Sequence, residues 1–383
     1  MTNTTRPTSK QTKYITVVTG TRAEFGLLRS VIAAISAHPK LQLRLIAAGQ
    51  HLTTGSYKDI LKSDFQIDAK VRMQTKNDSG YAADAQALAR GIASFATDFA
   101  SHPTHLVLVL GDRIEAFAAA SAAAISNIHL AHIHGGDRAE GIADESMRHA
   151  ITKLAHIHFP ASKQSATRIR KLGELPSTIH LHGSPSIDDL VLSIHQIESS
   201  TDIIVLQHPV GDSPKQEQSH MAQTLSAARK LAQQHNFKIL ILSPNADPGT
   251  TGINTAIDSF MKKPQANRNT THLTHLPRPQ FLAHLKNAKL ILGNSSAALI
   301  EAAALKTPAV NIGPRQNGRE KPRSVIDSPY GIKPVLTAAD KALTLNLSRM
   351  THPYGSGNAG LKIAKTLANL NLKSLSLRKQ NTF

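Results

Sequence analysis

Apolar residues in this chain form short continuous runs, separated by longer segments with helical periodicity. The clearest run is HLVLVLGD, residues 105–112, which is typical of a strand buried on both faces of a sheet. Each run is followed by a segment of helical character, and this alternation predicts parallel sheets with helices on both faces. Further strands are expected at residues 13–20, 41–49, 128–136, 157–161, 202–209, 238–245 and 289–296.

The alternation of strand and helix occurs twice along the chain. A chain of 383 residues is long enough to bury two cores, and the pattern gives way to polar residues at 192–201. We therefore predict an α/β protein with two Rossmann-like domains facing a cleft. The predicted divisions are a disordered N-terminal tail at 1–13, an N-terminal Rossmann-like domain at 14–195, a C-terminal nucleotide-binding Rossmann-like domain at 196–355, and a C-terminal helix and tail at 356–383.

Polar side chains directly follow most of the predicted strands. Ligands of open parallel sheets collect at the carboxyl ends of the strands. Two facing domains would bring these side chains into one cleft. The residues are Arg22, Asp112, Arg113, His134, His208, Asn245, Ser295 and Ser296.

The segment GNSSAALIE, residues 293–301, joins a predicted strand to a predicted helix. Ser295 or Ser296 can cap this helix, and the free N–H groups and positive dipole end of the helix suit a phosphate. Glu301 follows one to two turns later, where it can accept hydrogen bonds from ribose hydroxyls. The plainer alternative is an ordinary helix cap followed by a surface glutamate.

Two loops carry arginines that suit a diphosphate. The turn GTRAEFG carries Arg22, but it has neither the Gly-Lys-Ser ending of a Walker loop nor a GxGxxG pattern. The loop NIGPRQNGRE carries Arg315 and Arg319. Arginines are also common on protein surfaces, so a structural role remains an alternative for each.

Asp112 and His208 each close a buried strand. An unpaired carboxylate is costly at such a place. Either Arg113 or another nearby base compensates the charge of Asp112, or the carboxylate transfers protons with a tuned pKa. Because the chain holds 20 histidines, a structural role is the alternative for His208.

The segment HIHGGDRAEGIADESMRHA, residues 132–150, concentrates groups that bind metals or transfer protons. On a strand, His132 and His134 point to the same face, and Asp137 can complete a metal triad. Catalytic zinc usually has a more closed set of ligands. The sequence therefore favours a site without a metal.

The alternative for this segment is a loop that transfers protons. Its glycine pair, residues 135–136, lets the backbone approach a sugar. Asp144 and Glu145 open a helix, where the dipole favours carboxylates. Arg148 follows Asp144 by four residues, a spacing that allows the two to pair.

Composition limits the classes of partner. Lys and Arg exceed Asp and Glu by 18 (44 against 26), which indicates nucleic acid or anionic small molecules. The basic residues are dispersed, and aromatic residues make up only 4% with no Trp, so no nucleic-acid partner is expected. The N-terminus lacks the apolar region of a secretory signal, and no apolar run suggests a membrane partner. The absence of cysteine excludes thiolate chemistry and fits a cytoplasmic protein.

A set of longer motifs resembles the hydrolysing UDP-N-acetylglucosamine 2-epimerases of bacterial sialic-acid biosynthesis. In chain order the motifs are GTRAEFG, LGDRIEAFA, HIHGGD, DESMRHAITKLAHIHF, QHPV, SPNADPG, GNSSAALIEAAALKTPAVNIGPRQNGRE and HPYGSGNA. The resemblance covers nearly the whole chain. It implies a glycosyltransferase-B-like fold, a homodimer or homotetramer, a UDP-sugar substrate and no cofactor.

The resemblance also implies a reaction, in which the C2 proton and UDP leave and water adds to the resulting glycal. Asp112, Asp144 and His208 match family residues assigned to this chemistry. Many relatives have a catalytic glutamate where this chain has His134, so His134 is a candidate base and Asp137 a candidate acid.

The family's UDP-binding set is matched by residues from both predicted domains. Leu276 belongs to this set, although the animal enzyme has a valine there. The matching residues are Arg22, Arg113, His208, Asn245, Leu276, Ser295, Ser296, Glu301 and Arg315.

Three alternatives to this function remain open on the sequence. The first is the same reaction on a modified sugar such as UDP-N,N'-diacetylbacillosamine, on the way to legionaminic acid. The second is a glycosyltransferase of the same fold, and the third is a nucleic-acid binder.

Overall fold

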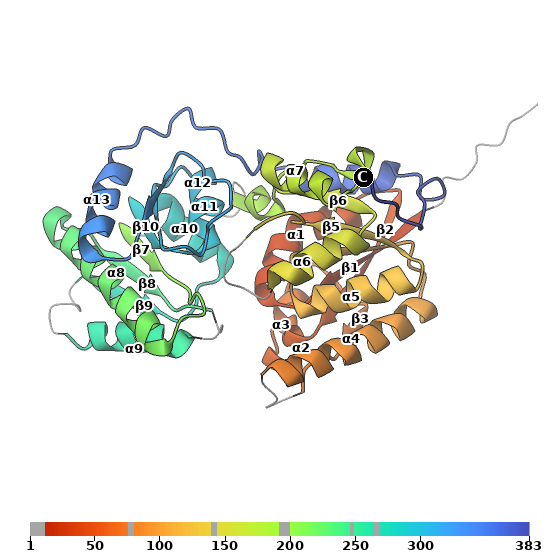
Figure 1. The fold of residues 1–383 in the computed structure, drawn as a ribbon, viewed down its shortest axis with the longest axis horizontal. Helices are drawn as coiled ribbons and strands as arrows, with labels where there is room; N and C mark the ends of the chain where they lie inside the picture. The colour runs from red at the N-terminus through yellow and green to blue at the C-terminus, as the bar shows by residue number, and fades with distance from the viewer. Residues whose placement is uncertain are drawn as a thin grey trace, which may run out of the picture. The chain divides into compact units, whose positions relative to one another are not determined.

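The chain folds into two compact units, each containing one six-stranded parallel sheet (Figure 1). This confirms the predicted α/β class with two parallel sheets. The predicted boundary near residue 195 lies outside the described residues. The computed structural model describes residues 12–75, 80–138, 144–190, 200–245, 249–263 and 269–382. Unit 1 comprises Met1–Gly136, Ser146–Pro185 and Asn358–Phe383, and unit 2 comprises Asp137–Glu145 and Ser186–Gly357.

The sheet of unit 1 has the strand order β3-β2-β1-β4-β5-β6. Its strands are β1 (Lys13–Thr19), β2 (Leu41–Ala48), β3 (Ala69–Val71), β4 (Leu106–Leu110), β5 (His129–Ile133) and β6 (Ile157–Phe159). The central strands are buried on both faces, as their continuous apolar runs require. One face packs against α1 and α14, and the other against α4, α5 and α6 (Figure 1). The helices of unit 1 are α1 (Arg22–Ser36), α2 (Gln50–Thr54), α3 (Tyr57–Leu61), α4 (Tyr81–Ser101), α5 (Ile114–Ile125), α6 (Asp144–Leu154), α7 (Lys163–Lys171), the 3-10 helix η1 (Pro176–Thr178) and α14 (Ala359–Asn369).

The last helix of the chain, α14, belongs to unit 1 and packs against α1. Ile363 and Leu367 of α14 are buried in the same core as Leu28 and Ile32 of α1. Gly360 allows this approach, because a Cβ there would lie 2.7 Å from the carbonyl carbon of Ser30. The first core is therefore completed by the end of the chain.

The sheet of unit 2 has the order β12-β11-β10-β7-β8-β9, which repeats the winding of unit 1 with β7 in the place of β1. Its strands are β7 (Ile203–Leu206), β8 (Ile239–Leu242), β9 (Thr270–Leu273), β10 (Leu290–Gly293), β11 (Ala309–Ile312) and β12 (Val325–Ser328). Helices α8, α9 and α13 cover one face. The helices of unit 2 are the 3-10 helix η2 (Pro185–Leu190), α8 (Pro214–His235), α9 (Thr250–Met261), α10 (Arg278–Asn287), α11 (Ser296–Leu299), α12 (Glu301–Ala304) and α13 (Ile332–Leu343).

Several element predictions are wrong in detail. The strands expected at 202–209, 238–245 and 289–296 end at Leu206, Leu242 and Gly293. The strand expected at 128–136 ends at Ile133, because His134 has a left-handed backbone (φ 65°). The segment AALIEAAAL is not one helix but two short ones, α11 and α12. The backbone of Ile300 between them leaves helical geometry (φ −104°, ψ −72°).

Each sheet reverses its winding direction once. In unit 1 the reversal lies between β1 and β4, and in unit 2 between β7 and β10. At such a switch point the connections leave in opposite directions, which opens a crevice at the carboxyl ends of the two strands. The residues that follow these four strands are therefore the first place to look for a site.

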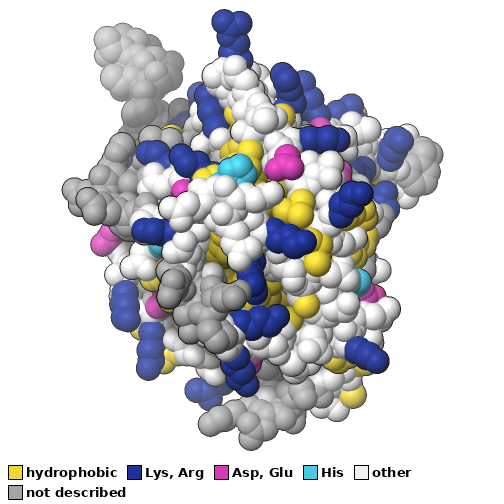
Figure 2. All heavy atoms as spheres, turned by 90° about the vertical axis from the view of Figure 1, so that its left-hand side faces the viewer, with side chains coloured by type: hydrophobic (Ala, Val, Ile, Leu, Met, Phe, Trp, Pro, Cys, Tyr) yellow, Lys and Arg dark blue, Asp and Glu magenta, His cyan; other side chains and the backbone are white. Residues whose placement is uncertain are grey.

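Charge is spread over the surface of the molecule. Figure 2 shows Lys and Arg side chains distributed over one whole face rather than gathered in a single stripe. Within the described ranges, no helix combines the length and the apolar character needed to cross a membrane.

We predict that Gly360→Val destabilises unit 1 through the contact between α14 and α1. Overpacking a tight contact costs about 1–3 kcal/mol of the free energy of unfolding. Urea denaturation measures this loss. The matched control is Leu361→Val at the neighbouring position, whose side chain is 68% exposed. Equal unfolding midpoints for the two variants would contradict the prediction.

Candidate active site

Two arginines stand at the switch point of unit 1. Arg22 is the first residue of α1, and its Nε lies 2.9 Å from the Asp59 carboxylate. Arg113 precedes α5, and its Nε lies 3.5 Å from Glu115 Oε2. The two side chains are 48% and 40% exposed, so both can be reached by an anion.

Asp112 follows β4 and is bound by Arg148 of α6, whose guanidinium donates a hydrogen bond to Asp112 Oδ2. The Arg148 side chain is only 4% exposed, so its charge depends on this carboxylate. The compensating base is therefore Arg148, and Arg113 lies instead beside Glu115. The side chain of Asp144, the other expected partner of Arg148, lies outside the described residues. The pairing places a positive charge against Asp112 and fixes the orientation of its carboxyl group.

His132 is a structural residue. Its buried imidazole donates from Nε2 to the carbonyl of Gly111 (2.7 Å), and its Nδ1 lies 3.2 Å from Thr152 Oγ1. The expectation that His132 and His134 share one face of a strand is wrong, since the strand ends between them. Among the residues that the structure describes, no group of three His, Asp or Glu side chains is arranged to hold a metal.

The turn after β5 places His134 beside Ser184, with 2.9 Å between His134 Nε2 and the serine hydroxyl. A Cβ at Gly135 would lie 2.9 Å from Thr152 Oγ1, and one at Gly136 would lie 2.4 Å from the carbonyl oxygen of Ser165. The glycine pair thus lets the turn after β5 pack closely against α6 and α7. This packing explains the two glycines without the expected approach of the backbone to a sugar.

Two buried glutamates near this switch point were missed by the sequence analysis. The backbone N–H of Gly20 donates to Glu24 Oε2 (2.7 Å), and the N–H of Gln50 donates to Glu115 Oε1 (3.1 Å). A Cβ at Gly20 or at Gly49 would clash with the Glu115 side chain. Glu115 therefore fixes the turns that follow β1 and β2.

Glu24 is held as a neutral acid. Burial raises its pKa to about 8 against the hydrogen bond from Gly20, and the nearby carboxylate of Glu115 adds to the rise. A glutamate at the start of a helix is ordinarily interpreted as a charge on the helix dipole. The neutral state of Glu24 follows from its burial and has no sign in the sequence.

Asn294 is the centre of the switch point in unit 2. Its side chain accepts from the N–H of His208 (2.7 Å) and donates to the His208 carbonyl (2.8 Å). The N–H of Asn245 donates to His208 Nδ1 (3.1 Å). The ends of three strands are thus joined by one network, and two of its members were predicted while Asn294 was not.

The imidazole of His208 is neutral. Removal from water, together with the charge of Arg315, lowers its pKa to about 3. Because Nδ1 accepts a hydrogen bond, the proton lies on Nε2. His208 therefore offers a neutral N–H donor.

The loop after β11 brings Arg315 to the same place. Arg315 Nη1 and Gln316 Nε2 both donate to the carbonyl of Asn294 (3.3 and 2.8 Å). Ser295 caps the short helix α11 by accepting from the N–H of Ala297. Leu276 lies half-buried after β9, outside this network of described hydrogen bonds.

Glu301 is buried and paired, so the alternative of a surface glutamate is wrong. Its carboxylate lies 3.3 Å from Arg278 Nη1, and Arg278 also donates to the carbonyl of Ser186. An oriented carboxylate remains suited to accept from hydroxyl groups. Its contact with a ribose stays a prediction.

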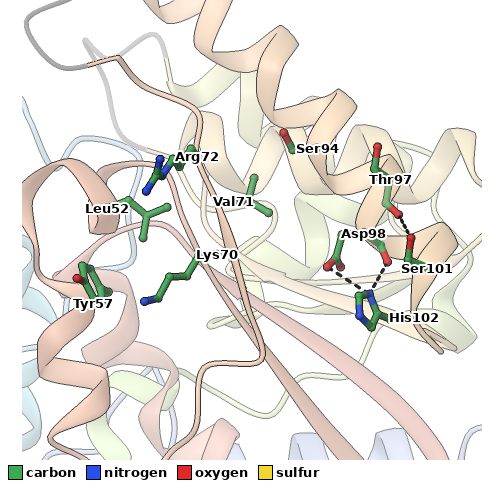
Figure 3. Close-up of a pocket in the computed structure, with 10 residues that line it drawn as sticks. All are labelled: Leu52, Tyr57, Lys70, Val71, Arg72, Ser94, Thr97, Asp98, Ser101 and His102. Atoms are coloured by element: carbon green, nitrogen blue, oxygen red, sulfur yellow. Dashed lines mark hydrogen bonds and ion pairs between the residues drawn. The ribbon is translucent and has the colours of Figure 1, made fainter.

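A cavity of about 750 Å³ lies elsewhere in unit 1, over the edge strand β3 (Figure 3). Its polar wall is already paired: Asp98 receives two hydrogen bonds of 2.6 Å from Arg44, and Lys70 lies over the ring of Tyr57. The lining residues drawn in Figure 3 include none of the predicted site residues.

Comparison with known proteins gives consistent matches over the whole chain. A family model described as UDP-N-acetylglucosamine 2-epimerase matches residues 33–368. A UDP-N,N'-diacetylbacillosamine 2-epimerase (hydrolyzing) of Legionella pneumophila is 33% identical, covering 96% of this chain and 99% of the relative. A UDP-N-acetylglucosamine 2-epimerase of Neisseria meningitidis is 30% identical, covering 90% and 92%.

The fold is that of solved structures with a glycosyltransferase-B-like architecture. A crystal structure of UDP-GlcNAc 2-epimerase from Neisseria meningitidis bound to UDP-GlcNAc has a TM-score of 0.74 and 18% identity, covering 93% of this chain and 99% of that chain. At this identity the likeness concerns the fold alone.

We predict that Glu24 makes the stability of the protein depend on pH. Between about pH 4.5 and 8 the unfolded chain ionises Glu24, whereas the folded chain keeps the proton, so stability falls as the pH rises. Glu24→Gln removes this dependence, which amounts to a slope of up to about 1.4 kcal/mol per pH unit. Urea denaturation at several pH values checks it, with the exposed Asp64→Asn as the control. Parallel curves for Glu24→Gln and the unchanged protein would contradict the prediction.

Proposed function

The chain belongs to the UDP-N-acetylglucosamine 2-epimerase family, and on this premise we propose that it hydrolyses as it epimerises, converting UDP-N-acetylglucosamine and water to N-acetylmannosamine and UDP. One observation carries the proposal. In both units, predicted site residues follow the two strands that flank the switch point, where doubly wound sheets bind their ligands: Arg22, Asp112 and Arg113 in unit 1, and His208, Ser295 and Ser296 in unit 2. The name of the Legionella relative, which includes "hydrolyzing", supports the hydrolytic form.

In this proposal the nucleotide is bound by groups of unit 2. His208 donates its Nε2–H to a phosphate oxygen, and the neighbouring Arg315 supplies a positive charge. In unit 1, Arg22 and Arg113 are two partly exposed arginines to which an anion can bind. Glu301 accepts from the ribose.

The chemistry is an elimination followed by a hydration. A base removes the C2 proton, its electron pair forms the C1–C2 double bond, and the C1–O bond breaks to release UDP. Water then adds its hydroxyl to C1, and a proton reaches C2 from the opposite face. The candidates for base and acid are Asp112, His134, Asp137 and Asp144. The contact with Arg148 supports Asp112 as a group held in a fixed orientation at the switch point.

A second candidate is the same reaction on UDP-N,N'-diacetylbacillosamine. The Legionella relative named for that sugar is 33% identical over nearly the full chain. Comparing kcat/KM for the two nucleotide sugars decides between them. A glycosyltransferase is not favoured, because the matching family model is that of the epimerases.

We predict that Asp112→Asn lowers kcat by roughly 10²–10⁴-fold, the usual contribution of a group that transfers protons. The amide keeps the shape of the carboxylate but cannot accept a proton. The dissociation constant of UDP, measured by calorimetry, should stay within about twofold, since the nucleotide contacts lie elsewhere. The control is the exposed Asp84→Asn. A near-normal kcat would assign Asp112 a structural role.

The test of the proposed reaction is isotopic. In D₂O the protein should release a free 2-acetamido sugar of manno configuration with deuterium at C2, because that centre is deprotonated and protonated again. In H₂¹⁸O the label should enter the sugar at C1 and not the UDP, because the C1–O bond breaks. NMR and mass spectrometry read both labels. A gluco product with protium at C2 would refute the proposal even if UDP were released quickly.

A further inference from the structure

The segment after α14 docks where β5 and β6 begin, at the edge of the sheet opposite to the candidate site. His129 Nε2 donates to the carbonyl of Leu375 (2.9 Å), and His156 Nε2 donates to the carbonyl of Leu377 (3.3 Å). Leu375 also packs against the first core. The backbone of this segment is thus held by side chains of the sheet.

Lys379 of this segment reaches the C-terminal end of α6. Its ammonium donates to the carbonyls of Lys153 (2.6 Å) and Ala155, and lies 3.5 Å from that of Thr152. The last carbonyls of a helix have no partner within the helix and carry the negative end of its dipole. Lys379 supplies both the hydrogen bonds and the positive charge that this end requires.

Glu174 holds the ammonium in place. Its Oε2 lies 2.7 Å from Lys379 Nζ, and its Oε1 lies 2.6 Å from Lys153 Nζ. Burial would raise the pKa of Glu174, but hydrogen bonds from His158 and the two lysines bring it down to about 2. The carboxylate is therefore ionised at neutral pH, and its contacts with Lys379 and Lys153 form a clamp at the end of α6.

Arg148, the partner of Asp112, lies in the middle of α6, between one and two turns before the carbonyls that Lys379 binds. Thr152, whose carbonyl faces Lys379, donates from its hydroxyl to the carbonyl of Arg148 (2.9 Å) and lies beside His132. His132 in turn binds the carbonyl of Gly111, next to Asp112. A continuous series of contacts runs from Lys379 along α6 to the candidate site.

We propose that Lys379 is a positioning residue, which fixes the axial position of α6 and thereby sets the Arg148 guanidinium against Asp112. The C-terminal segment is then part of the catalytic framework, although it touches no substrate. The effect on turnover rests on the proposed function, whereas the effect on α6 does not.

The experiment compares Lys379→Met with Lys379→Arg and with Lys373→Met, an exposed lysine of the same segment. Hydrogen exchange of the α6 amides is measured without substrate, and kcat, KM and the UDP dissociation constant are measured with UDP-N-acetylglucosamine. In Lys379→Met, α6 should exchange at least about threefold faster. Its kcat should fall roughly ten- to a hundredfold, as misplaced groups do, with KM and UDP affinity within about twofold. Lys379→Arg should retain most of the exchange protection of α6 and most of kcat, and Lys373→Met should change neither quantity.

Unchanged exchange in α6, or faster exchange with unchanged kcat, would overturn the proposal. Equal losses in kcat and in UDP affinity would also overturn it, since they indicate general loosening. If Lys379→Met does not fold, Lys379→Gln takes its place, because its amide still donates to carbonyls without the charge. If the unchanged protein lacks epimerase activity, the proposed function fails, while the exchange of α6 still tests the clamp.

Discussion

The winding of the two sheets is the constraint on which the rest of this structure depends. A parallel sheet covered on both faces leaves only its strand ends for polar groups, and the ends that flank the reversal of winding are the least obstructed. Asp112 and Arg113 lie there in unit 1, and His208 and Ser295 lie there in unit 2. The topology of the backbone therefore gathers these polar groups at a few turns.

Burial then decides the charge state of the groups at those turns. A buried arginine, Arg148, lies against the carboxyl group of Asp112, whereas burial raises the pKa of Glu24 to about 8 and keeps it neutral. His208 loses its proton for the same reason and becomes a donor without charge. Each residue owes its state to its surroundings rather than to its type, and neighbouring carboxylates thus serve different purposes.

The fold could be predicted from the sequence because its central strands are continuous apolar runs. The edge strands β3 (AKV), β9 (TTHL) and β12 (VIDS) escaped prediction, since they are short and partly polar. Spacing along a helix suggested Asp144 as the partner of Arg148. The contact of Arg148 with Asp112, which follows β4, joins residues far apart in the chain and leaves no signal in the sequence. Glu24 and Asn294 were missed for a similar reason, because burial and long-range hydrogen bonds distinguish them from ordinary capping or turn residues.

The division of the chain has a consequence for its synthesis. Nearly all of unit 2 is one uninterrupted run, Ser186–Gly357, whereas the core of unit 1 needs Ile363 and Leu367 of α14. At translation speeds of about 5–20 residues per second, the second sheet leaves the ribosome complete while the first still lacks a helix on one face. Unit 1 therefore receives the α14 helix of its core only after unit 2 has been synthesised.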